Sequence, residues 1–404
     1  MIVNPYKHHR NYSLAILWGA CKIDHEDFVE DIGEIPHFLH TFISLITERL
    51  GITVNKLTKL TSALATIMVL MSCGQQTEVQ KPTDKVAPVV ATAVKDSLIK
   101  PIDAPEIKEP AKVELGKKLW FDTRLSKSGA LSCNSCHNVM SSGTDNLTSS
   151  IGHGWAEGPI NSPTVYNAVF NIKQFWDGRA DTLKAQAGGP IENPMEMAST
   201  HEHVVTVLNS IPEYQAEFKK AYNVDEVTID QVTDAIALFE ETLVTPNSRF
   251  DKWLRGDETA INDEEKKGYE LFNSVGCTAC HNGPAVGGTS FQKFGVYGKY
   301  MTKNGAIGVG GLTKNKDEEM VFKVPTLRNI EMTYPYFHDG AVNTLSEAVD
   351  IMGEIQLDKK FTPEENAQIV AFLRTLTGER PKLEMPLLPN STEKTPRPAP
   401  FKKK

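Results

Sequence analysis

The sequence feature that most constrains this chain is a five-residue pattern, Cys-x-x-Cys-His, that occurs twice. Its spacing is that of a c-type haem attachment site. Two thiols three positions apart can each bond one vinyl group of the same porphyrin, and the adjoining histidine becomes an axial ligand of the iron. We therefore expect two covalently bound haem c groups. The attachment residues are Cys133, Cys136 and His137 for the first haem and Cys277, Cys280 and His281 for the second.

A zinc site is the alternative interpretation, in which four cysteines converge on one metal ion. The two cysteine pairs are separated by about one domain length, ~100–150 residues, and each pair carries its own histidine. This separation favours two haem-binding domains over one zinc site.

Length and composition are those of a globular protein with a sizeable core, because the 404 residues are 40% hydrophobic and 23% charged. The formal net charge is −8, which argues against nucleic acid as a partner. Four of the six cysteines belong to the haem motifs and Cys73 belongs to a targeting signal, which leaves only Cys21, so we expect no structural disulfide. Covalent haem attachment indicates an exported protein.

The N-terminal part is expected to contribute little to the fold. We expect translation to start near Val54, which leaves residues 1–53 as an extension without a clear motif. Residues 54–72 combine lysines with a short apolar run, the pattern of a secretory signal. The end of this run resembles a bacterial lipoprotein signal, which implies a lipid anchor on Cys73. Residues 73–110 contain five prolines and are expected to form a linker.

Two mostly α-helical haem domains are expected over residues 111–248 and 249–380. Apolar residues recur at helical intervals over 113–121, 203–209 and 229–243, and an acidic helix is expected over 263–272. Capping boxes at Thr344 and Thr362 predict two further helices, and Gly353 is expected to end the first of them. Residues 381–404 are rich in proline and lysine and are expected to be a disordered tail.

The second axial ligands of the irons are less constrained by the sequence. His153 lies in a loop rich in serine and glycine, residues 141–163, which could carry it to the first iron. A loop histidine that contacts only solvent is the alternative. Met352 is a candidate for the second iron, but it shares a helix face with Leu345 and Val349, so packing in the core is its alternative role.

Several strings, taken together and in this order, resemble the bacterial di-haem cytochrome c peroxidase family, which also contains MauG-type enzymes. Besides the haem motifs, they are residues 151–154 (Ile-Gly-His-Gly), 161–164 (Asn-Ser-Pro-Thr), 175–179 (Phe-Trp-Asp-Gly-Arg), 190–197 and 334–340. The resemblance covers roughly residues 110–380. It implies reduction of hydrogen peroxide to water with electrons from a small c-type cytochrome or a cupredoxin. It also implies a homodimer in the periplasm.

The resemblance further implies the ligands of the irons and the route between them. His153 matches the second ligand of the first, low-potential haem in the resting enzyme. Met352 matches the second ligand of the second, high-potential haem, and a His/Met-ligated iron has a raised potential. Trp176 matches a tryptophan that lies between the haems.

Two residues match the lining of the family's peroxide pocket. Glu196 would transfer a proton between the peroxide oxygens as a general acid-base, and Gln186 would orient the peroxide. The side chain of Asn161 and the carbonyls of Thr333 and Pro335 match a calcium site between the domains. Such a site needs several waters to reach 6–8 oxygen ligands.

Two alternative functions remain open at this point. A MauG-like enzyme would oxidise a partner protein, and those enzymes resemble a version with tyrosine at the position of Met352. A di-haem electron carrier would need both irons permanently six-coordinate, and it would leave Glu196 and Gln186 without a function. Members of the family also differ on whether activity requires prior half-reduction.

Overall fold

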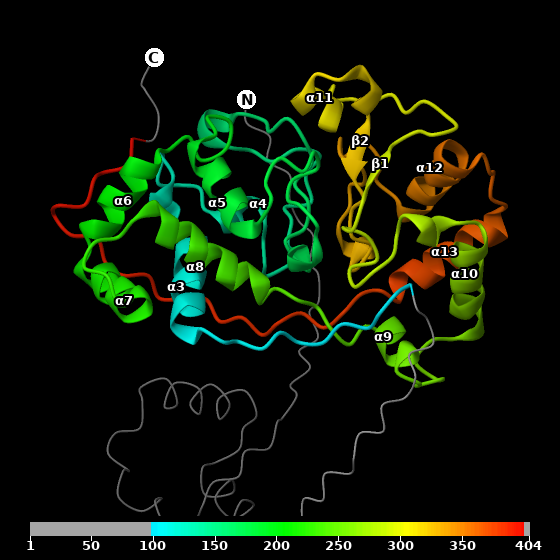
Figure 1. The fold of residues 1–404 in the computed structure, drawn as a ribbon, viewed down its shortest axis with the longest axis horizontal. Coiled ribbons are helices and arrows are strands. Elements are labelled where there is room, and N and C mark those ends of the chain that lie inside the picture. The colour runs from blue at the N-terminus through cyan, green and yellow to red at the C-terminus, as the bar shows by residue number, and fades with distance from the viewer. Residues whose placement is uncertain (1–97, 400–404) are drawn as a thin grey trace, which may run out of the picture. The chain divides into compact units, whose positions relative to one another are not determined.

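The computed structural model describes residues 98–399 (Figure 1). The extension, the signal, Cys73 and most of the linker lie outside this range. The described helices and strands are α3 (Pro110–Phe121), α4 (Cys133–Cys136), α5 (Leu183–Glu192), α6 (His201–Asn209), α7 (Pro212–Tyr222), α8 (Ile229–Glu241), α9 (Arg249–Leu254), α10 (Asp263–Ser274), β1 (Phe291–Lys293), α11 (Val309–Thr313), β2 (Val321–Lys323), α12 (Leu345–Leu357) and α13 (Pro363–Arg374).

The prediction of a mostly α-helical fold is confirmed. Within residues 98–399 the only named strands are β1 and β2, which pair antiparallel with Phe291 opposite Lys323. No helix in this part of the chain is long and apolar enough to cross a membrane.

The first haem motif belongs to a helical group formed by α3 and α5 to α8. α3 packs against α8, and the two helices lie side by side in Figure 1. Their backbones approach closely at Gly116, where an added Cβ would lie 1.8 Å from the carbonyl oxygen of Ala235. The apolar faces of these helices form one core cluster, with Leu119, Val232 and Phe239 almost fully buried.

The second haem motif belongs to a helical group built in the same way from α10, α12 and α13. α10 packs against α13, and here the close approach is at Gly268. A Cβ on Gly268 would lie 1.9 Å from the carbonyl oxygen of Gln368. In both groups, therefore, the helix that precedes the haem motif crosses a later helix at a glycine.

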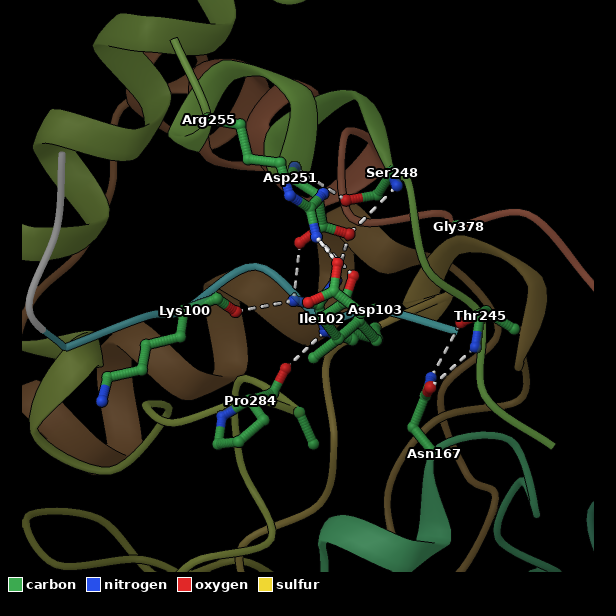
Figure 2. A network of polar contacts seen from close by, with 12 residues as sticks. Lys100, Ile102, Asp103, Asn167, Thr245, Ser248, Asp251, Arg255, Pro284 and Gly378 are labelled. Atoms are coloured by element: carbon green, nitrogen blue, oxygen red, sulfur yellow. Dashed lines mark hydrogen bonds and ion pairs between the residues drawn. The ribbon is translucent and has the colours of Figure 1, made fainter. Parts of the chain in front are cut away.

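A buried polar seam joins the two groups (Figure 2). Asn167 and Thr245 exchange two hydrogen bonds of 2.9 Å, one from the asparagine amide and one from the threonine backbone N–H. The Asn329 amide donates to the Thr245 hydroxyl at 3.0 Å. Because all three side chains are buried, their pairing satisfies groups that would otherwise be costly.

The expected linker differs from the structure over its last residues. Ile99 and Ile102 are buried, and Ile99 belongs to the core cluster of the second group. The Leu98 carbonyl accepts a hydrogen bond from the Gly283 N–H at 2.8 Å, two residues after the second haem motif. Two isoleucines three positions apart give this segment an apolar face, which explains why it packs.

The expectation of a disordered tail is wrong for residues 381–399, which follow a defined extended course. Leu383 packs against the core of the first group. The Arg124 guanidinium donates to the Pro389 carbonyl at 2.8 Å, and the Thr392 hydroxyl donates to the Ser210 carbonyl at 2.9 Å. Composition suggested disorder, but these contacts with the first group order the segment.

The predicted end of α12 at Gly353 is also wrong, because the helix continues to Leu357. Asp358 takes the left-handed conformation that ends it, with a φ of 52°. Gly353 instead permits a close approach, since an added Cβ would lie 2.6 Å from the Phe361 ring.

Candidate active site

The first Cys-x-x-Cys-His motif lines a cavity of about 440 Å³, a volume typical of small-molecule sites. Cys133 and Cys136 begin and end α4, and the serine before them caps this turn. The Nδ1 of His137 lies 3.0 Å from the Pro163 carbonyl. This contact leaves Nε2 for a metal. Burial lowers the pKa of His137, which favours the neutral form that ligates metals.

The second motif lines a separate cavity of about 290 Å³. Its residues follow α10, and Gly276 turns the chain with a φ of 100°. His281 is 8% exposed, and burial lowers its pKa to about 4 although backbone groups of Val286 and Pro325 act in the opposite direction. Met352 lines the same cavity, and its role as an iron ligand stays a prediction.

The chemistry of these thiols fits covalent haem attachment. Burial raises the pKa of Cys133 and of Cys277 to about 12, which favours the neutral thiol. Zinc would require thiolates converging on one ion. Among the described residues no three His, Cys, Asp or Glu side chains are grouped to hold a metal ion. Each motif instead lies in its own largely apolar cavity, which suits a porphyrin.

The structure brings Gln186 and Glu196 together with the first motif in the same cavity. Gln186 lies in the first half of α5, which Thr182 caps through the Ala185 N–H. Glu196 follows α5 and accepts a hydrogen bond of 2.6 Å from the Asn193 amide. Burial raises the pKa of Glu196, whereas the Asn193 amide and the Arg179 charge oppose that rise.

His153 lies beside this cavity but is not among the residues that line it. It begins a tight turn in which the Gly152 N–H donates to the Ala156 carbonyl at 2.8 Å. The His153 N–H donates to the Glu196 carbonyl at 2.8 Å. Gly152 is packed closely against Met195, whereas the next glycine has open space. The backbone therefore places His153 next to Glu196 on an exposed turn.

Trp176 lies at the wall between the two cavities. It lines the second cavity, and its neighbour Phe175 lines the first. The indole N–H donates to the Asn161 carbonyl at 2.9 Å. The ring meets Phe322 and His338 edge to face, with centroids 6.4 and 6.3 Å apart. These contacts fix the ring where the two cavities share residues.

The three residues expected to hold calcium all line the second cavity. Asn161 is 7% exposed, its amide donates to the Leu147 carbonyl at 2.9 Å, and its N–H donates to the His338 carbonyl at 2.9 Å. These three residues therefore lie along one cavity, and calcium binding by them stays a prediction.

Four polar residues that line the first cavity were not predicted from the sequence: Arg179, Asn193, Glu240 and Lys323. Arg179 and Asn193 lie within the strings 175–179 and 190–197, but no role followed from their spacing, and Lys323 lies in none of those strings. Glu240 was invisible because it continues a helical pattern. It is 3% exposed, and its Oε2 is buried without a hydrogen-bond partner.

We expect Glu240→Gln to stabilise the protein at alkaline pH. Burial raises the pKa of Glu240 to about 8 from an ordinary 4.5. The folded state therefore holds this proton more tightly than the unfolded state, and stability falls as pH rises from about 4.5 to about 8. The variant removes this loss, roughly 2–4 kcal/mol, so its melting temperature should exceed the native value at pH 9 and match it near pH 4.

Thermal unfolding followed by circular dichroism at both pH values checks this expectation. Glu226→Gln, at an exposed loop position, is the matched control and should behave like the native protein at each pH. A Glu240→Gln variant with the native pH dependence of melting would contradict the assignment.

Comparisons with known proteins agree with the arrangement of two haem motifs. The family model described as Di-haem cytochrome c peroxidase matches residues 110–259, and the one described as Cytochrome c matches residues 265–377. The cytochrome c551 peroxidase of Nitrosomonas europaea is 59% identical over 303 residues, which cover 75% of this chain and 91% of that protein. The cytochrome c551 peroxidase of Pseudomonas aeruginosa is 51% identical over 71% of this chain and 84% of that protein. A solved MauG-like protein associated with microbial copper homeostasis superimposes with a TM-score of 0.61 at 28% identity, covering 71% and 95% of the two chains.

Proposed function

The chain belongs to the di-haem cytochrome c peroxidase family, and we propose that it reduces hydrogen peroxide with electrons from a small c-type cytochrome or a cupredoxin. The observation that carries the proposal is the meeting of Gln186 and Glu196 with the first haem motif in one cavity. An electron carrier has no use for a half-buried carboxyl group at that position. Met352 in the second cavity favours the peroxidase over a MauG-like enzyme with tyrosine there.

The two domains, residues 111–248 and 249–380, would each hold one haem c. Cys133 and Cys136 would form the thioether bonds of the first haem, and His137 and His153 would ligate its iron. The corresponding residues of the second haem are Cys277, Cys280, His281 and Met352. The bound haems would pass on the donor's electrons and would provide the iron site at which peroxide reacts.

The protein's own residues manage the protons. Conversion of one hydrogen peroxide to two waters consumes two electrons and two protons. In our proposal Glu196 takes the proton from one peroxide oxygen and returns it to the other, and Gln186 holds the peroxide by hydrogen bonding. The raised pKa of Glu196 brings that carboxyl closer to the pH at which it must both accept and release a proton.

The turn that carries His153 would control access to the first cavity. It contacts the catalytic side through the backbone hydrogen bond from His153 to Glu196 and through the close packing of Gly152 against Met195, whereas Gly154 and Trp155 are exposed. We propose that His153 moves from its resting position only in the half-reduced protein, and that this movement would open the first cavity to peroxide. Trp176 is fixed at the wall between the cavities and would ease electron transfer between the two haems.

Other parts of the proposal depend on the family rather than on the site. Calcium held by Asn161, Thr333 and Pro335 would stabilise the region between the domains, and two copies would form a homodimer. Covalent haem attachment would require export, so we propose a periplasmic location. A lipid anchor on Cys73 would tether it to the membrane, which the intact mass of the mature chain tests.

The proposed function predicts that the mature chain carrying both haems oxidises reduced cytochrome c when peroxide is added. We expect two donor molecules oxidised per peroxide, with rapid turnover after half-reduction in the presence of calcium. Stopped-flow measurement of donor oxidation, in the oxidised and half-reduced states and with or without a calcium chelator, checks this. A variant with Cys133→Ala and Cys136→Ala is the negative control, because it cannot attach the first haem.

Each outcome has a consequence. Turnover in both redox states supports the peroxidase and overturns the proposed movement of His153. Turnover that is insensitive to chelation overturns the calcium assignment. No turnover in either state, with both haems attached, overturns the peroxidase in favour of an electron carrier or a protein-oxidising enzyme.

A further inference from the structure

We propose that the ammonium group of Lys323 pairs with a haem propionate at the wall shared by the two cavities, and that this charge raises the reduction potential of the paired haem. The proposal rests on the two haems of the proposed function but not on peroxide turnover. It makes Lys323 a positioning residue for the cofactor and a determinant of how electrons divide between the haems.

Lys323 lies at the wall that the two cavities share. It ends β2 and pairs with Phe291 of β1. Among the described residues that line both cavities, Lys323 is the only one with an ionisable side chain. Its N–H donates to the Trp176 carbonyl at 2.8 Å, and the next N–H, of Val324, donates to the Ser290 carbonyl at 2.9 Å. The backbone therefore holds this lysine firmly beside the tryptophan.

The charged side chain of Lys323 is buried. The residue is 6% exposed, and burial lowers its pKa to about 8. Within residues 98–399 no carboxylate forms an ion pair with its Nζ. Lysines are almost never buried unless they are paired, because a buried unpaired charge is costly. The fold thus creates a demand for an anion at this wall. Each haem c carries two propionate carboxylates, which have the required charge.

Phe322, the residue before Lys323, belongs to a cluster of aromatic rings. Phe322 stacks on the His338 ring with centroids 4.3 Å apart, and Trp176 meets both rings. Phe322 precedes Lys323 in β2 and lines the same two cavities, and a largely apolar cavity strengthens the attraction between opposite charges. It also strengthens the effect of a fixed positive charge on an electron added to a nearby iron. Loss of this charge should therefore make the paired haem harder to reduce.

The test is a spectroelectrochemical titration of both haems in the fully loaded protein, without peroxide or donor. In Lys323→Met, the preference of at least one haem for its reduced state should fall at least tenfold, which is about 59 mV for one electron. Lys323→Arg keeps the charge and should remain within about threefold of the native value. Lys299→Met, at an exposed position that lines neither cavity, is the matched control and should show no shift.

Resonance Raman spectra of the haem propionate bending bands provide the second measurement. These bands report on contact with a propionate and should change in both Lys323 variants. Lys323→Arg keeps the test available if Lys323→Met fails to acquire its haems. Unchanged potentials in a loaded Lys323→Met protein, or unchanged propionate bands in Lys323→Arg, would overturn the proposal. Because neither measurement involves peroxide, these failures would leave the peroxidase proposal intact.

Discussion

Glu196→Gln should lower the rate of peroxide reduction by about 10²–10⁴-fold, the usual contribution of a positioned acid-base group, while both haem spectra stay native. Glutamine has nearly the shape of glutamate, and its carbonyl can still accept the 2.6 Å hydrogen bond from the Asn193 amide. The Glu196 main chain that anchors the His153 turn is unaffected by the substitution. The variant therefore removes the proton-accepting group and keeps the cavity.

Glu192→Gln is the matched control for this experiment. Glu192 ends α5, four positions before Glu196, but it is exposed and is not among the residues that line the cavity. Its substitution should leave turnover within about twofold of native. Steady-state turnover with reduced cytochrome c, together with absorption spectra of both proteins, measures the difference. Native turnover in Glu196→Gln would exclude the acid-base role.

The pH profile separates an acid-base role for Glu196 from a structural one. Glu196 must be ionised to accept the first proton, and its pKa is raised by burial. Native activity should therefore fall on acidification, starting at a higher pH than for an exposed glutamate. The residual activity of Glu196→Gln should lack this acid limb, which a purely structural role would not remove.

Helix starts were predictable from the sequence because their signals are local. The side chains of Thr344 and Thr362 accept hydrogen bonds from N–H groups three residues further on, and both predicted starts are confirmed. The end of α12 is set instead by Asp358 in the left-handed conformation, whereas Gly353 serves a close approach to Phe361 that spacing does not reveal. α5 was not predicted because Pro190 and two glycines lie inside it, although Thr182 caps its first turn.

The site divides in the same way. The haem-binding residues were predictable because the attachment chemistry requires a fixed local spacing. Glu196, Gln186 and Trp176 entered through the resemblance to a family, and no spacing in this chain singled them out. Lys323 and Glu240 could not be predicted because their properties come from burial by distant segments. A lysine beside two apolar residues, or a glutamate in a helix, has the same local sequence when it is exposed.

Arg328 illustrates such long-range dependence most strongly. Arg328 and Asp251 are both fully buried, and their side chains form two parallel hydrogen bonds of 3.0 and 2.9 Å. The guanidinium also donates to the carbonyls of Lys100 and Pro284. Asp251, Lys100 and Pro284 converge in Figure 2. One side chain therefore ties together α9, the segment before α3 and the loop that follows the second haem motif.

Arg328→Met should lower the free energy of unfolding by about 3–5 kcal/mol, because removal of one partner leaves the other charge buried and unpaired. We expect the melting temperature to fall by roughly 10 °C, measured by circular dichroism on the haem-loaded protein. Since the Pro284 carbonyl loses its donor, the spectrum of the second haem should change at a lower temperature than that of the first.

Two comparison variants decide whether the unpaired charge causes this loss. The double variant Arg328→Met with Asp251→Leu removes both charges and should recover part of the stability, because the buried carboxylate no longer lacks a partner. Lys219→Met breaks an exposed pair with Asp225 and should cost less than about 1 kcal/mol. If Arg328→Met melted within a degree or two of the native protein, or if the double variant were as unstable as the single one, the buried pair would not be what joins these three segments. A large loss in Arg328→Met with partial recovery in the double variant would mean that the support of the second haem depends on a charge balance set by residues 77 positions apart.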